Sequence, residues 1–100
     1  MEQGVIYAIK NLANNKVLIG STTIFKDLER MFKEAKKTNP SKILSLELQE
    51  EWKKCGAENF VLEVLEEFEQ EEGQLFEEFE DELLEAEEMW KERFDEKDLY

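Results

Sequence analysis

The sequence contains no histidine and a single cysteine, Cys55, among its 100 residues. Without histidine, Ser-His-Asp triads and histidine-ligated metal sites are excluded. A lone cysteine forms no internal disulfide and does not supply the repeated thiolates of a structural zinc site. Most familiar hydrolase and metalloprotein chemistry is therefore excluded, and we interpret Cys55, beside Gly56, as a packing residue at a helix end.

Long apolar runs are also absent. No stretch approaches the roughly 18 apolar residues that would span a bilayer, and Met1-Glu2-Gln3 lacks the basic and apolar regions of a signal peptide. These absences predict a soluble, cytoplasmic protein with no membrane partner. A chain of this length has room for one modest core, so we expect a single domain over residues 1–100.

The net charge of −13 is unevenly distributed. Residues 1–65 hold 9 acidic and 10 basic side chains, a net of +1, whereas residues 66–100 hold 17 acidic and 3 basic ones, a net of −14. The domain thus divides into a near-neutral part, 1–65, and a strongly acidic part, 66–100. Nucleic-acid binding depends on neutralising phosphates, so any such surface is expected on the first part, where basic side chains could form a lip. They are Lys10, Lys16, Lys26, Arg30, Lys33, Lys36 and Lys37.

Two segments near the start have the composition of paired strands. Residues 4–9 and 16–20 are rich in β-branched and aromatic side chains. Asn14-Asn15 lies between them, and asparagine tolerates the positive φ of a tight turn better than most residues. The pattern predicts a β-hairpin.

The next segments predict two helices and a strand. Phe25, Leu28, Phe32 and Ala35 recur at helical spacing after the hydroxyls of residues 21–23, which are suited to capping. Residues 38–40, Thr-Asn-Pro, end this helix, and Ser41 is expected to cap a second one that carries Ile43-Leu44, Leu48 and Trp52 and stops at Gly56. Residues 60–65 form a nearly continuous apolar run, which predicts a well-buried third strand.

The acidic part contains the longest helical pattern. Apolar residues form a narrow seam among Glu and Asp, as in a helix that lies along a sheet or pairs with another helix, so an oligomer is also possible. They are Phe76, Phe79, Leu83, Ala86, Trp90 and Phe94. The predicted order is hairpin, helix, helix, strand, helix, an α/β (α+β) fold.

Four segments, taken in order, resemble the GIY-YIG nuclease superfamily. They are residues 4–7 (GVIY), 17–22 (VLIGST), 48–66, which run from a helix into a strand, and 83–90 (LLEAEEMW). The resemblance implies a small three-stranded antiparallel sheet flanked by helices. It also implies an endonuclease that hydrolyses the phosphodiester bonds of nucleic acid with a divalent cation, Mg²⁺ or Mn²⁺.

The resemblance also implies roles for individual residues. Tyr7 matches the first-strand tyrosine beside the nucleophile, Gly20 the glycine that ends the second strand, and Glu87 the metal-binding glutamate. A phenol oxygen can orient or deprotonate water, and a hard carboxylate oxygen suits Mg²⁺. Lys16, Gly20 and Lys33 are expected to bind substrate near this site.

Other family positions have changed. Leu18 replaces the second tyrosine, Met31 stands at the arginine position and Ala35 at the histidine position. Arg30, one residue earlier, is the candidate to steady the phosphate, although a shift of one residue turns a helical side chain by about 100°. The predicted active site is therefore incomplete.

The incomplete site leaves two alternatives open. In the first, the chain is a catalytically inactive binding module whose acidic helix docks a basic protein or imitates the phosphates of a nucleic acid, while the old pocket binds phosphate or nucleotide. In the second, the glutamates serve only to keep a small protein soluble.

Overall fold

A computed structural model describes residues 2–37 and 46–100. The expected break at residues 38–40, the cap at Ser41 and the pair Ile43-Leu44 lie outside the described residues. None of the helices within the described ranges is long and apolar enough to cross a membrane.

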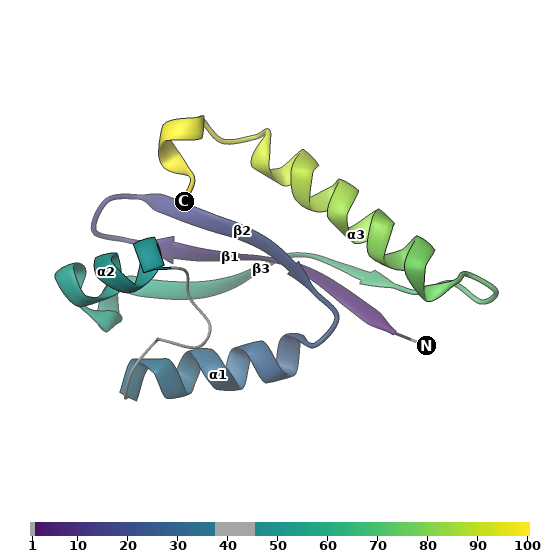
Figure 1. The fold of residues 1–100 in the computed structure, drawn as a ribbon, viewed down its shortest axis with the longest axis horizontal. Coiled ribbons are helices and arrows are strands. Elements are labelled where there is room, and N and C mark those ends of the chain that lie inside the picture. The colour runs from purple at the N-terminus through teal and green to yellow at the C-terminus, as the bar shows by residue number, and fades with distance from the viewer. Residues whose placement is uncertain (1, 38–45) are drawn as a thin grey trace.

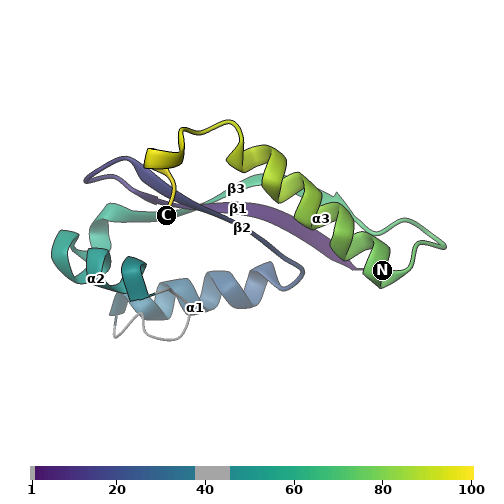
Figure 2. The same cartoon turned by 45° about the horizontal axis from the view of Figure 1, so that its top comes forward.

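Three strands form one antiparallel sheet in the order β2-β1-β3, with β1 in the centre. Figures 1 and 2 show α1 and α2 on one face of this sheet and α3 on the other. The predicted fold class and its three-stranded sheet are confirmed. The element bounds are β1 Gln3–Asn11, β2 Lys16–Thr22, α1 Phe25–Lys37, α2 Leu46–Cys55, β3 Phe60–Glu69 and α3 Phe76–Lys91, with short 3₁₀ turns η1 Ala57–Asn59 and η2 Glu96–Asp98.

The predicted hairpin is present. Asn15 has a φ of 62°, and its N–H donates to the Asn11 carbonyl at 2.8 Å, which closes the turn. The register that follows pairs Tyr7 with Gly20 and Ile9 with Leu18. This pairing brings the two sequence motifs of the hairpin side by side.

Alternation along β1 sends its side chains into two separate cores. Ile6 and Ala8 face α3, whereas Ile9 faces α1 and α2. The core on the α1 and α2 face is Ile9, Phe32, Ala35, Leu48, Trp52 and Phe60, and the one beneath α3 is Ile6, Ala8, Val17, Ile19, Phe79 and Leu83. Each amphipathic helix therefore covers its own face of one thin sheet.

The prediction of a well-buried third strand was wrong. β3 is an edge strand that continues to Glu69, and Val61 and Val64 on it are 38% and 41% exposed. An apolar run indicates a strand but does not determine its place in the sheet, which depends on long-range pairing with β1.

Two helix ends also differ from expectation. The Thr22 hydroxyl accepts the Ile24 N–H at 3.0 Å, in the turn before α1 rather than at its first turn. α3 ends at Lys91, yet Phe94 packs on the same core from beyond the helix. At the other end of the seam, Phe76 is exposed, because the helix reaches the sheet only from Phe79 onward.

Candidate active site

Tyr7 lies across the edge strand β2 because its partner there is a glycine. A Cβ placed on Gly20 would come within 2.5 Å of both Cζ and the hydroxyl oxygen of Tyr7. Any larger residue at position 20 would displace the ring. The Tyr7–Gly20 pair thus carries a phenol hydroxyl from the central strand over the outer strand of the hairpin.

Glu87 reaches the same strand from α3. Its Oε1 accepts the Ser21 hydroxyl at 2.8 Å, and its Oε2 lies 2.9 Å from the Lys91 ammonium. Its side chain is only 16% exposed. Since Ser21 directly follows Gly20, this contact fixes the carboxylate beside the segment that Tyr7 covers.

The two groups interact electrostatically. Burial raises the pKa of Tyr7 above its usual value of 10.0, and the negative charge of Glu87 raises this pKa further. Both effects disfavour the phenolate. The Tyr7 hydroxyl therefore keeps its proton at neutral pH and is available as a hydrogen-bond donor.

Lys91 supplies the positive charge of the site. The hydrogen bond to Glu87 raises the pKa of Lys91, against a smaller opposing effect of burial, and Glu88, 3.5 Å from the ammonium, raises it too. A cation is thus already present on one oxygen of Glu87. Ser21 and Lys91 were both missed from the sequence; the available signals were the position of Ser21 after Gly20 and the i,i+4 spacing of Lys91 from Glu87.

The donor chemistry fits a divalent cation at Glu87. Mg²⁺ usually takes one or two protein carboxylates and completes its shell with water and substrate phosphate, so a single glutamate is an adequate anchor. Among the described residues no group of three or more His, Cys, Asp or Glu side chains could hold a metal by itself. A bound ion would compete with the Lys91 ammonium for Oε2.

The other predicted site residues lie elsewhere. Arg30 is 67% exposed and pairs with Asp27 on its own helix at 3.4 Å. Lys33 is exposed on α1, and the Lys16 ammonium lies 5.5 Å from the centre of the Tyr100 ring. The structure therefore brings Tyr7, Gly20 and Glu87 together, but no described contact joins the three basic residues to them, and their roles stay predictions.

The family positions that have lost polar groups contribute to the core. Leu18 packs against the core on the α1 and α2 face, and Ala35 is a buried member of it. Met31 is half-buried on the same helix. Apolar side chains therefore occupy the three positions at which the resemblance implies polar ones.

Comparison with solved structures identifies the family. The chain is similar to the catalytic domain of the homing endonuclease I-TevI, at 33% sequence identity and a TM-score of 0.68, over 97% of this chain and 95% of that one. The chain belongs to the GIY-YIG nuclease family. A glutamate-to-alanine mutant of the catalytic domain of intron endonuclease I-TevI is also similar, with a TM-score of 0.62 and 33% identity over 91% of this chain and 82% of that one.

No protein-family model matches the sequence, and no curated protein does. The GIY-YIG assignment therefore depends on the structural comparison, which supports a nuclease-like function. It agrees with the resemblance seen in the hairpin, the 48–66 segment and the helix that carries Glu87.

Proposed function

We propose that this chain is an endonuclease-like domain that hydrolyses phosphodiester bonds of nucleic acid with one bound Mg²⁺ or Mn²⁺, in the cytoplasm. One observation supports the proposal: Ser21 holds the Glu87 carboxylate next to Gly20, the residue that the Tyr7 ring covers, and the charge of Glu87 acts on the Tyr7 hydroxyl. A donor and a hard anionic ligand beside each other suit a phosphate ester and its attacking water.

Tyr7 is proposed to bind and orient either the attacking water or the phosphate. Because its pKa is raised, the hydroxyl keeps its proton and donates it in a hydrogen bond, either to the attacking water or to a phosphate oxygen. We therefore assign the hydroxyl an orienting role, which is narrower than the role inferred from the resemblance. Gly20 contributes because it has no side chain and leaves the space that the Tyr7 ring occupies.

Glu87 is proposed to hold the cation through the oxygen that now contacts Lys91, while Ser21 keeps the other oxygen in position. When bound, the cation supplies charge stabilisation to the phosphate and activates water. Lys91 would add a positive charge beside the phosphate binding position. Arg30 and Lys33 stay candidates for contacts farther along the substrate.

The direct test is cleavage of supercoiled, linear and single-stranded DNA and of RNA with Mg²⁺ or Mn²⁺. We expect weak cleavage that Glu87→Gln and Tyr7→Phe each reduce by about 10²-fold, since positioned catalytic groups typically contribute that much. The matched control is Glu88→Gln, a neighbour on α3 whose side chain is 68% exposed and lies 3.5 Å from the Lys91 ammonium. Equal activity in Glu87→Gln and Glu88→Gln would overturn the proposal.

A second function is favoured by the Lys91–Glu87 ion pair and by the exposed position of Arg30. In this reading the domain binds nucleic acid, phosphate or nucleotide without cutting. It predicts no cleavage of any substrate by wild-type protein, together with phosphate binding that Lys91→Ala weakens and EDTA leaves unchanged.

A further inference from the structure

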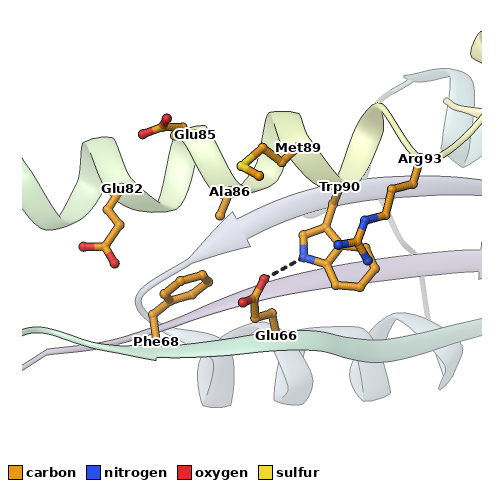
Figure 3. Close-up of a pocket in the computed structure, with 8 residues that line it drawn as sticks. All are labelled: Glu66, Phe68, Glu82, Glu85, Ala86, Met89, Trp90 and Arg93. Carbon is orange, nitrogen blue, oxygen red and sulfur yellow. Dashed lines mark hydrogen bonds between the residues drawn. The ribbon is translucent and has the colours of Figure 1, made fainter.

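A groove of about 310 Å³ lies between α3 and β3, on the α3 face of the sheet. Figure 3 shows Phe68 and Glu66 pointing from β3 toward α3, with Ala86 and Trp90 pointing down from the helix. The full lining is Glu66, Phe68, Glu82, Glu85, Ala86, Met89, Trp90 and Arg93. None of these residues belongs to the site at the β2 edge.

The groove exists because α3 is offset across the sheet. α3 packs mainly on β2 and β1, so the face of the edge strand β3 beside it is left partly uncovered. The floor is apolar, with Phe68 and Trp90 half-buried, and Met89 at the rim is 59% exposed. Apolar surface of this kind, rimmed by polar residues, is typical of a docking site.

The rim of the groove is anionic and its aromatic wall is held in place. Glu66, Glu82 and Glu85 surround the floor, within a part of the chain whose net charge is −14. The Trp90 indole N–H donates to Glu66 Oε1 at 2.9 Å, and the Arg93 guanidinium lies 4.1 Å from the ring centre. The indole face thus already accepts a guanidinium in a cation–π contact.

We propose that this groove docks a cationic protein segment, in which a bulky apolar side chain enters between Phe68 and Met89 while flanking Lys or Arg side chains pair with the glutamates. Charge complementarity selects this occupant. Nucleic acid is repelled by the same carboxylates, and a second copy would have to bring its own acidic part alongside. The inference is independent of the proposed hydrolysis, because it uses the opposite edge of the sheet.

The probe is a short synthetic peptide with two leucines flanked by lysines and arginines, titrated by fluorescence polarisation and by the emission of Trp90. We expect saturable binding that weakens as salt rises. A peptide with the same charges but serine for leucine should bind about tenfold more weakly, as for the loss of an anchor side chain. Equal binding of the two peptides would overturn the proposal.

Two matched pairs of variants locate the binding. Glu82→Lys should weaken the peptide about tenfold, whereas Glu80→Lys, the same charge change on the same helix outside the groove, should weaken it much less. Likewise Met89→Glu should weaken binding relative to Leu84→Glu, both at exposed positions. Equal effects within each pair would mean that the peptide is attracted nonspecifically by the negative charge of the protein, and would contradict the proposal.

Two further measurements are needed. One distinguishes a second copy of the chain from a cationic segment as the occupant, and the other keeps the docking test independent of the proposed hydrolysis. Concentration-dependent self-association that Glu82→Lys abolishes, without peptide binding, would make a second copy the occupant and contradict the proposal. Peptide binding is measured on wild-type protein with EDTA present, so a failure of hydrolysis leaves its outcome unaffected.

Discussion

The helices α1 and α3 are both amphipathic and cover opposite faces of the same sheet, but of the predicted site residues on these helices only Glu87, on α3, has a described contact with β2. α3 buries Phe79 and Leu83 and holds Glu87 against Ser21. α1 buries Phe32 and Ala35, which turns Arg30 toward solvent.

Tyr7 and Glu87 thus approach the candidate site from opposite faces of the sheet. Tyr7 starts on the face of α1, but its ring passes over Gly20 toward the edge, where the charge of Glu87 reaches it. On the α1 side, apolar residues occupy the positions that would complete the site. Substitutions on the two faces of the sheet test this difference between α1 and α3.

The largest effect is expected for Phe79→Ala, beneath α3. Truncating a fully buried phenylalanine costs about 3–5 kcal/mol, and Phe32→Ala on the other face should cost a similar amount. Phe79→Ala should also lower the pKa of Tyr7 by loosening the helix that carries Glu87, whereas Phe32→Ala should lower it through lost burial, because Tyr7 packs against the core that contains Phe32. Denaturant unfolding gives the first quantity. Absorbance titration in a Tyr100→Phe background gives the second, since Tyr7 is then the only tyrosine. An unchanged Tyr7 pKa in Phe79→Ala would show that the packing of α3 does not hold Glu87 near Tyr7.

Gly20→Ala is expected to destabilise the fold by about 1–3 kcal/mol, because the new methyl group overlaps the Tyr7 ring. Combined with Tyr7→Ala, the same substitution should cost much less. A double-mutant cycle by chemical denaturation measures this coupling. Additive effects of the two substitutions would show that the ring does not depend on the glycine.

Ser21→Ala removes a hydrogen bond to a mostly buried carboxylate and should cost about 1.5 kcal/mol, at the low end for bonds to charged groups. The control is Thr23→Ala, two residues further along the chain. If both variants unfold at the same denaturant concentration, the Ser21–Glu87 contact contributes nothing measurable.

Alkaline pH should weaken the fold through Tyr7. Its folded pKa lies above the unfolded value of 10.0, so the native state binds the proton more tightly. The stabilisation is complete below pH 10 and is lost as pH rises through the folded pKa. Stability curves of wild type and Tyr7→Phe should therefore converge above that pKa. Glu87→Gln should lower the Tyr7 pKa in the same absorbance titration, but not to 10.0, because burial is the larger cause.

The smallest effect is expected for Arg30→Ala, since an exposed i,i+3 ion pair contributes less than about 0.5 kcal/mol. Thermal unfolding should be almost unchanged. Cleavage measured on the same variant tests whether Arg30 steadies the phosphate. A large loss of activity at unchanged stability supports this role, and full activity contradicts it.

The sequence by itself determined the local elements of this protein. β-branched and aromatic composition with the Asn14-Asn15 turn predicted the hairpin, and helical spacing predicted α1 and the seam of α3, because composition and spacing are local properties of the chain. The motif around Tyr7, Gly20 and Glu87 pointed to the family for the same reason. The structure pairs Tyr7 with Gly20 and brings Glu87 beside them.

Only the tertiary structure decided how these elements meet. The edge position of β3, the Ser21–Glu87–Lys91 contacts, the outward turn of Arg30 and the uncovered groove beside Trp90 all depend on strand order and on where α3 crosses the sheet. These features depend on packing between residues far apart in the chain, so no local sequence pattern predicts them. The sequence motifs thus suggested the family that the structural comparison shows, whereas the packing of α1 and α3 determined which side chains lie near the candidate site.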